Sequence, residues 1–205
     1  MQQIILASRN PGKVREFAAM FSPLGYEILP LSAFPQIEDI VEDGETFVEN
    51  ARIKAETVSR QLGMAVLADD SGLVVHYLGG QPGVRSARFA EPGATASDAA
   101  NNAKLLAMLD GVPLSRRQAH FAAALAYARP GQETLFTEGR CFGLIWTHER
   151  GSNGFGYDPL FYLPQFSQTM AELAPAAKNQ ISHRAKALRS MADLIRRDPP
   201  PTCCQ

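Results

Sequence analysis

The chain has 205 residues, 45% of them hydrophobic, and a formal net charge of -1 from 20 Lys and Arg against 21 Asp and Glu. This length and apolar content exclude a largely disordered chain and suffice for one domain with a substantial core. The balanced charge argues against non-specific binding of long nucleic acids, which needs a strongly basic surface. Because the sequence offers neither a signal-peptide core nor a membrane span, we expect a cytoplasmic protein without a membrane partner.

The N-terminal part of the chain has the pattern of an α/β protein. An apolar run at residues 3–7 predicts a buried strand, residues 14–21 repeat apolar side chains at helical spacing, and residues 26–31 predict a second strand. Residues 8–13 form the loop between the first strand and the helix, where free backbone N–H groups and the helix dipole favour an anion. An ordinary surface turn is the competing interpretation of this loop.

A second helix follows, with a clear start signal. Thr46 and Glu49 have the spacing of a capping box, which predicts that a helix begins there. Along this helix Asn50 and Lys54 lie one turn apart, so both can reach one object. The apolar residues 64–68 then predict a third strand.

Two adjacent carboxylates, Asp69 and Asp70, follow the third predicted strand. We expect the strand to end there, which places both acids at the C-terminal edge of a sheet, where open α/β sheets bind ligands. Carboxylate oxygens suit Mg²⁺, which is usually held by one or two of them together with substrate phosphates. A second acidic group can complete such a site; its members are Glu38, Asp39, Glu42 and Asp43. For Glu38 and Asp39 a solvated loop is the favoured interpretation.

The second half of the chain predicts longer strands. Residues 119–127 alternate larger apolar side chains with small ones, residues 133–142 return as a hairpin partner, and strand character continues to Trp146. Further helices are predicted at residues 97–109 and 182–197.

These elements together predict an α/β fold, with a mixed, elongated sheet, flanking helices and two lobes around a central substrate cleft. We expect a single domain over residues 1–197. The last residues, 198–205, contain three consecutive prolines that cannot continue a helix, and they predict a flexible tail.

A glycine-rich segment at residues 151–159 places aromatic side chains between glycines. Gly154 and Gly156 lack the third glycine of a dinucleotide fingerprint, so a Rossmann site is weakly supported. Phe155 can instead stack on a base while Asp158 accepts from a ring N–H. A tight turn with Phe155 in the core is the alternative.

The cysteines and histidines do not by themselves indicate a site. Cys141, Cys203 and Cys204 have neither the arrangement of a disulfide framework nor metal-ligand spacing. His183 begins the last predicted helix, where a lone histidine is more often a cap or surface residue than a catalyst. The structural interpretation applies to His76, His120 and His148.

Six motifs, in this order, resemble the inosine triphosphate pyrophosphatases, Mg²⁺-dependent enzymes that hydrolyse non-canonical purine nucleoside triphosphates. They are Ser8-x-Asn10-x-x-Lys13, Thr46-Phe47-x-Glu49-Asn50-Ala51-x-x-Lys54-Ala55, Ala68-Asp69-Asp70-Ser71-Gly72-Leu73, Pro82-Gly83-x-x-Ser86-Ala87-Arg88, Phe155-Gly156-Tyr157-Asp158-Pro159 and Ser182-His183-Arg184. The resemblance runs from about Ile4 to about Arg197. Three positions differ from the usual pattern: Ser8 replaces Thr, Arg9 replaces a common Gly, and Tyr157 stands where some members carry Trp.

The resemblance implies hydrolysis of XTP, ITP or dITP to the monophosphate and pyrophosphate, with attack of water at the α-phosphorus. It implies that Glu42 and Asp70 hold Mg²⁺ and that Asp70 is the general base, although the sequence alone does not separate Asp70 from Asp69. The implied triphosphate-binding residues are Ser8, Arg9, Asn10, Pro11, Gly12, Lys13, Lys54 and Ser71. The implied base-binding residues are Phe155, Gly156, Tyr157, Asp158, Lys178, His183 and Arg184.

Within the implied base site, Phe155 and Tyr157 would stack on the purine, and Lys178, His183 or Arg184 would donate to its 6-keto oxygen. Arg9 either reaches a phosphate or faces water. The resemblance also implies a homodimer. Two other classes remain as alternatives, a regulatory module that binds nucleotides without cleaving them, and a nucleic-acid-binding protein, which the balanced charge argues against.

Overall fold

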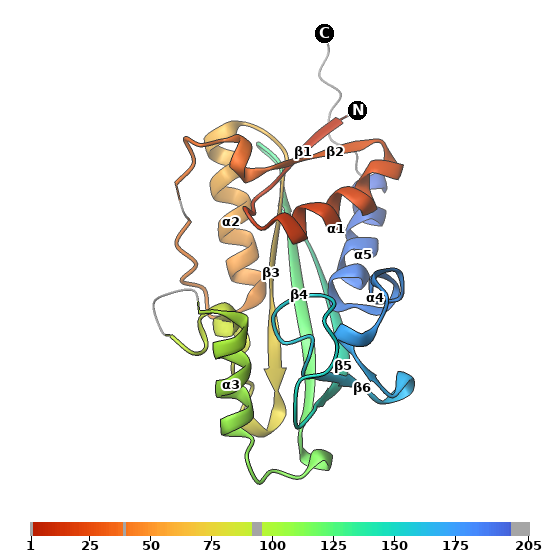
Figure 1. The fold of residues 1–205 in the computed structure, drawn as a ribbon. Helices are drawn as coiled ribbons and strands as arrows, with labels where there is room; N and C mark the ends of the chain where they lie inside the picture. Colours follow the sequence, from red (N-terminus) through yellow and green to blue (C-terminus); the bar gives the residue numbers. More distant parts are fainter. Residues whose placement is uncertain (1, 39, 92–95, 198–205) are drawn as a thin grey trace. The chain divides into compact units, whose positions relative to one another are not determined.

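The computed structural model describes residues 2–38, 40–91 and 96–197 (Figure 1). The chain divides into two compact units. The first unit comprises Met1–Asp70, Ala123–Glu138 and Lys186–Gln205, and the second comprises Ser71–Ala122 and Gly139–Ala185. Both units are therefore assembled from segments that are distant in sequence. The predicted tail at residues 198–205 lies outside the described residues, and the predicted cleft stays a prediction.

A seven-stranded sheet has the order β2-β1-β3-β4-β5-β6-β7. β1 pairs in parallel with β2 and β3, whereas β6 pairs antiparallel with β5 and β7. The predicted mixed α/β fold with flanking helices is therefore confirmed. The strands are β1 (Gln2–Leu6), β2 (Tyr26–Pro30), β3 (Val66–Val75), β4 (Gln118–Ala128), β5 (Leu135–Ile145), β6 (Phe161–Leu163) and β7 (Gln168–Thr169).

The helices are α1 (Pro11–Phe21), α2 (Phe47–Leu62), α3 (Asp98–Met108), α4 (Pro175–Ile181) and α5 (His183–Arg197). Four of them match the predicted helices closely. α4 was not predicted, because its seven residues are too few to show a helical repeat, although Pro175 at its first position is a favourable start. No helix in the described part of the chain is long and apolar enough to cross a membrane.

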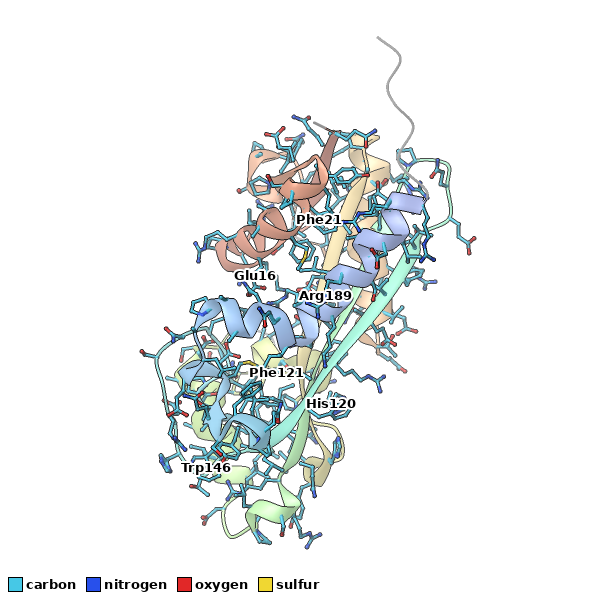
Figure 2. The ribbon with its side chains drawn as sticks, turned by 90° about the vertical axis from the view of Figure 1, so that its right-hand side faces the viewer. Glu16, Phe21, His120, Phe121, Trp146 and Arg189 are labelled. Carbon is cyan, nitrogen blue, oxygen red and sulfur yellow. The ribbon has the colours of Figure 1, made fainter. Side chains whose placement is uncertain are left out.

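In the first unit, β1 supplies the core on both of its faces. Successive side chains of a strand point to opposite sides, so Ile4 packs with α1 and α5 while Ile5 packs with α2. Phe21 of α1 belongs to the same cluster as Leu188 and Met191 of α5 (Figure 2). Burial on both faces explains why residues 4–7 form a continuous apolar run.

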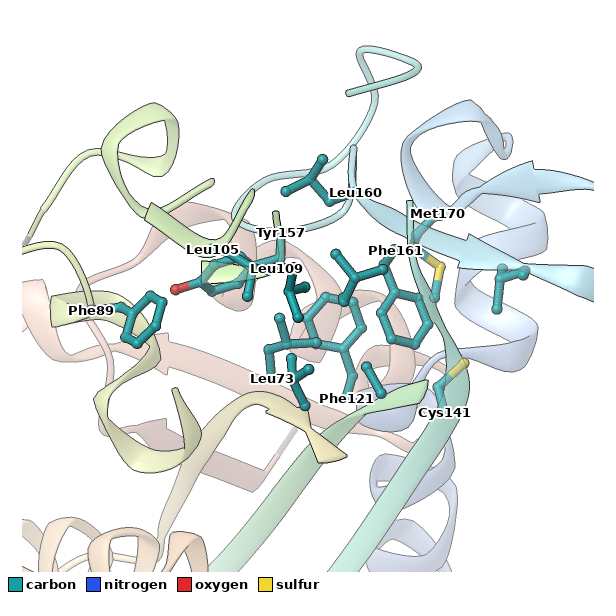
Figure 3. Close-up of a cluster of buried hydrophobic side chains, with 14 of the residues drawn as sticks. Leu73, Phe89, Leu105, Leu109, Phe121, Cys141, Tyr157, Leu160, Phe161 and Met170 are labelled. Carbon is teal, nitrogen blue, oxygen red and sulfur yellow. The ribbon is translucent and has the colours of Figure 1, made fainter. Parts of the chain in front are cut away.

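The second unit has its own hydrophobic core, in which aliphatic side chains surround several aromatic rings. Phe121 of β4 lies 4.4 Å from Phe161 of β6 between ring centroids. Leu105 and Leu109 lie beside Tyr157 in the same cluster (Figure 3). Tyr157 belongs to this core and thereby anchors the glycine-rich segment at residues 151–159.

The prediction that β3 ends before Asp69 is wrong. The strand continues through Asp69, Asp70 and Ser71 to Val75, because Leu73 and Val75 pack in the core of the second unit. Since neighbouring residues in a strand point to opposite faces, the two carboxylates are directed apart. Strand geometry therefore gives Asp69 and Asp70 different surroundings.

Candidate active site

A buried lysine on α2 is the centre of a charged cluster in the first unit. Lys54 Nζ lies 2.8 Å from Glu42 Oε2 and 3.3 Å from Asp70 Oδ1, and it donates to the Asp69 carbonyl oxygen at 3.0 Å. The Thr46 capping box fixes where α2 begins, as predicted from the sequence. Glu42 comes from the segment that runs beside α2 before the chain enters the helix (Figure 1).

The electrostatics of this cluster favour an ionised lysine and a basic carboxylate. Burial raises the pKa of Asp70, the charges of Glu42 and Asp69 raise it further, and Lys54 and Lys13 oppose this rise. Burial alone would lower the pKa of Lys54, but the carboxylates of Asp70 and Glu42 raise it above its ordinary value. Asp70 therefore binds a proton more readily than an exposed aspartate does, which suits a general base.

The structure separates Asp69 from Asp70, which the sequence alone did not. The Asp69 side chain is fully buried and its Oδ2 lies 2.7 Å from Lys13 Nζ. The Asp70 side chain retains 12% exposure. Asp69 therefore anchors Lys13, and Asp70 is the acid that solvent reaches.

The loop between β1 and α1 is organised by Asn10. Its Oδ1 accepts the backbone N–H groups of Gly12 at 2.8 Å and Lys13 at 3.2 Å, while Ser8 Oγ accepts the Asn10 N–H at 3.2 Å. The prediction of free N–H groups at this helix start is therefore wrong for Gly12 and Lys13, because the Asn10 side chain already accepts from both of them. Pro11, at the first helical position, has no N–H. The Lys13 ammonium group remains a charged donor in this loop.

Arg9 has a role that neither sequence interpretation included. Its Nη2 donates to the Ile37 carbonyl oxygen at 2.6 Å. This bond ties the loop after β1 to the segment that leads toward Glu42.

A second cluster surrounds Phe155 in the second unit. Lys178 Nζ lies 2.5 Å from Asp158 Oδ2, which also accepts the Phe155 N–H at 3.0 Å. The Phe155 side chain is exposed, with Lys178 Nζ 5.0 Å and Arg184 Cζ 5.6 Å from its ring centroid. The alternative that Phe155 lies in the core is therefore wrong, and the structure presents an aromatic ring flanked by two cations.

The Asp158 carboxylate is held in an enclosed position. It is 4% exposed, and burial raises its pKa although Lys178 acts in the opposite direction. A side chain on Gly154, which has a positive φ of 83°, would collide with this carboxylate. Glycine is therefore required at this turn both for its backbone conformation and for space.

The start of α5 brings the remaining predicted residues together. Arg184 Nη2 donates to Ser71 Oγ at 3.1 Å, and the His183 ring stacks on Phe121 with 4.9 Å between centroids. Ser182 Oγ accepts the Ala185 N–H at 3.1 Å, which is a helix-capping contact. All three side chains of the Ser182-His183-Arg184 motif are thus held in place.

The prediction that Tyr157 stacks on a base is wrong in this structure. Its ring is buried in the core, and its hydroxyl donates to the Ser86 carbonyl oxygen at 2.8 Å (Figure 3). Burial, followed by the charge of Asp98, raises the Tyr157 pKa far above its usual range. Asp98, which no sequence motif indicated, accepts the Gly156 N–H at 2.6 Å. No local signal connects these residues, because they meet only in the folded chain.

The other histidines and the cysteines keep their structural interpretation where they are described. His76 Nε2 lies 3.1 Å from His120 Nδ1 in the second unit, and Cys141 is buried. Cys203, Cys204 and Asp39 lie outside the described residues.

Two of the acidic residues have the chemistry of ligands for a hard metal ion. Among the described residues, no group of three or more His, Cys, Asp or Glu side chains is placed to hold a metal. Glu42 and Asp70 are hard oxygen donors that both meet Lys54. Mg²⁺ is commonly bound by one or two carboxylates with substrate phosphates completing its coordination, and this donor set fits that arrangement.

The fold and the two clusters define a mixed α/β protein with a lysine–carboxylate centre in one unit and a cation-flanked aromatic ring in the other. The chain belongs to the Ham1 family, whose model matches residues 4–194.

Named relatives and solved structures support this assignment. The chain is 56% identical over 191 residues to the dITP/XTP pyrophosphatase of Geobacillus kaustophilus, covering 93% of each chain. It is 52% identical to the dITP/XTP pyrophosphatase of Bacillus licheniformis, covering 95% of this chain and 98% of that one. The solved Ham1 protein of Staphylococcus aureus is 39% identical with a TM-score of 0.87, covering 96% of this chain and all of that one. The Coxiella burnetii HAM1 structure is 40% identical with a TM-score of 0.88 and the same coverage.

Proposed function

We propose that this protein is a nucleoside triphosphate pyrophosphatase that hydrolyses non-canonical purine nucleoside triphosphates, XTP, ITP and dITP, to the monophosphate and pyrophosphate. The observation that carries this proposal is the cluster of Lys54, Asp70 and Glu42, in which a buried ammonium group lies between two carboxylates. The names of the relatives, dITP/XTP pyrophosphatase, indicate the substrate class. Removal of such nucleotides from the pool is the corresponding role.

The first unit supplies the groups that bind the triphosphate. Lys13 provides a positive charge, and Ser8 and Asn10 provide short polar side chains in the loop before α1. Lys54 adds a second ammonium group from α2. Charge-assisted hydrogen bonds from such groups are the strong contacts that phosphates form in proteins.

The reaction needs a water molecule that is activated at the α-phosphorus. Asp70 takes the proton from that water, since its burial and its neighbouring carboxylates make it more basic than an ordinary aspartate. Glu42 and Asp70 would hold Mg²⁺, which would offset phosphate charge when it is bound with the substrate. Lys54 keeps both carboxylates oriented through its contacts with them.

The second unit supplies the groups that select the base. Phe155 stacks on the purine, and Asp158, two residues after Gly156, accepts a ring N–H. Arg184, Lys178 or His183 donates to the 6-keto oxygen. The amino group of a 6-amino purine is itself a donor, so it would face these donors and leave buried polar groups without acceptors. Such a mismatch can lower kcat/KM for an analogue by about 10⁴-fold.

The assembly and location of the protein are part of the same proposal. We propose a homodimer in the cytoplasm that acts on free nucleotides, with no nucleic-acid or membrane partner. Light scattering tests the dimer, because a mass near 22.3 kDa would contradict it.

Product analysis tests the proposed reaction directly. Purified protein is incubated with ITP and Mg²⁺, and the products are separated. IMP with pyrophosphate is the expected result, whereas IDP with orthophosphate would indicate a phosphohydrolase. Tight binding of ITP without turnover would favour the nucleotide-binding module instead. Omission of Mg²⁺ should abolish turnover.

Lys13→Ala should weaken binding of the triphosphate without affecting the choice of base. Loss of one charge-assisted hydrogen bond should raise KM for ITP and XTP alike by about ten-fold. Lys13→Arg, which retains the charge beside Asp69, is the matched control. Steady-state kinetics with both substrates provides the measurement, and a change confined to one substrate would place Lys13 at the base.

Two substitutions in the second unit should separate stacking from selection. Phe155→Ala should weaken the binding of all purine substrates by roughly ten-fold, because base–aromatic stacking is worth about 1–3 kcal/mol and does not depend on the 6-substituent. Arg184→Ala should lower kcat/KM for ITP more than it lowers kcat/KM for ATP. The ratio of kcat/KM values for ITP and ATP is the measurement, and an unchanged ratio in Arg184→Ala would remove Arg184 from base selection.

A further inference from the structure

Asn50 is a buried polar residue that shares a face of α2 with Lys54. It is 3% exposed, and both ends of its amide are engaged. Asn50 Oδ1 accepts the Gly44 N–H at 2.9 Å, and Asn50 Nδ2 donates to Asp70 Oδ2 at 3.2 Å. The predicted convergence of Asn50 and Lys54 on one object is thus confirmed, and the object is Asp70.

The backbone of Gly44 fixes which way the amide points. A backbone N–H can only donate, so the atom of Asn50 that faces it must be the oxygen. The amide NH₂ group therefore faces Asp70, and Asp70 Oδ2 must act as an acceptor. Lys54 meets the other carboxylate oxygen, Oδ1, so the plane of the Asp70 carboxylate is held at both oxygens.

The approach of Gly44 to Asn50 leaves no room for a side chain. A Cβ on Gly44 would lie 2.7 Å from Glu49 Cβ and 2.8 Å from Asn50 Oδ1. Only glycine therefore allows this hydrogen bond. Because Gly44 lies two residues after Glu42, the bond also restrains the segment that carries Glu42.

We propose that Asn50 is a positioning residue, which sets the Asp70 carboxylate and the Glu42 segment relative to each other through one side-chain amide. This inference rests on the proposed function, because it assigns Asn50 to the reaction at Asp70. Asn50 acts through Asp70 and Gly44 and requires no contact with the substrate. Groups that orient a ligating carboxylate typically contribute about 10- to 100-fold to activity.

A matched pair of asparagine variants provides the test. Asn50→Ala should lower kcat for ITP by about 10- to 100-fold while KM changes by less than about three-fold, since the phosphate and base contacts remain. Asn101 is the control, because it is also 3% exposed, lies on a helix and accepts a backbone N–H, that of Ala90, at 2.8 Å. Asn101→Ala should lower the melting temperature comparably and leave kcat near the wild-type value.

A second variant separates the two ends of the amide. Asn50→Asp keeps an acceptor for the Gly44 N–H but places a carboxylate against Asp70 Oδ2. We expect it to lose at least as much kcat as Asn50→Ala. Wild-type kcat in both Asn50 variants, or an equal loss in Asn101→Ala, would overturn the proposal. Retained activity in Asn50→Asp alone would also overturn it, because the contact with Asp70 would then be dispensable.

A measurement without substrate distinguishes failure of this inference from failure of the proposed function. The Gly44 amide should be protected from hydrogen exchange in the wild type and in Asn101→Ala, and should lose that protection in Asn50→Ala. Equal exchange in all three proteins would overturn the positioning role, whether or not ITP is hydrolysed. A wild type that releases no pyrophosphate would instead overturn the proposed function.

Discussion

Asp70→Asn should reduce kcat for ITP by about 10² to 10⁴-fold, the range expected when a general base is removed. Asparagine preserves the size of the side chain and an oxygen for Lys54, but it lacks the charge that accepts a proton and holds Mg²⁺. Binding of ITP should persist, because Lys13 and the base-selecting residues are unchanged. Steady-state kinetics and calorimetric titration of ITP into the variant measure the two effects separately.

Asp69→Asn is the matched control for this prediction. The side chain of Asp69 is fully buried against Lys13, so its replacement should lower stability and raise KM, with a smaller effect on kcat. Normal turnover in Asp70→Asn together with loss of turnover in Asp69→Asn would reverse the assignment of the two acids. The two substitutions should have distinct effects, because adjacent residues of β3 point to opposite faces and the two acids have different surroundings.

Local sequence signals predicted most of the helices and strands. The capping box at Thr46 and Glu49 fixed the start of α2, and helical spacing then placed Asn50 and Lys54 on one face. These predictions succeeded because they depend on hydrogen bonds and side-chain spacing within a few residues. The family resemblance added the candidate site residues, which local signals do not group.

The wrong predictions concern features that depend on distant parts of the chain. β3 continues beyond Asp70 because Leu73 and Val75 enter a core that is built largely from later segments. Tyr157 is buried because its ring packs in the core of the second unit, and its hydroxyl donates to the carbonyl oxygen of Ser86, 71 residues earlier. Neither partner is visible in a local window of sequence. The Asn10 cap depends only on neighbouring residues. An asparagine just before a proline is typical of a helix N-cap, so this contact could be predicted from the sequence.

Lys54→Met should be the most destabilising of the site substitutions. Methionine retains much of the apolar stem but leaves Asp70 and Glu42 without their shared ammonium group. Removal of one partner from a buried ion pair costs about 3–5 kcal/mol, and we expect the lower end because Glu42 keeps access to solvent. Urea unfolding at neutral pH measures this loss, and turnover of ITP should fall with it because Asp70 loses the contact that orients its Oδ1.

The pH dependence of Lys54→Met distinguishes an unpaired charge from a simple packing defect. Burial already raises the Asp70 pKa and Lys54 opposes that rise, so the variant should raise the pKa further. A carboxyl group whose pKa is higher in the folded state contributes stability below its unfolded pKa, and this contribution is lost as pH rises through the folded value. Relative to wild type, the free energy of unfolding of Lys54→Met should therefore be lower at pH 8 than at pH 5.

The double variant Lys54→Met/Asp70→Asn should recover part of this stability at pH 8, because one of the two unpaired carboxylates is gone. It should recover none of the activity. An equal loss at both pH values without recovery in the double variant would show that Lys54 stabilises the fold by packing alone.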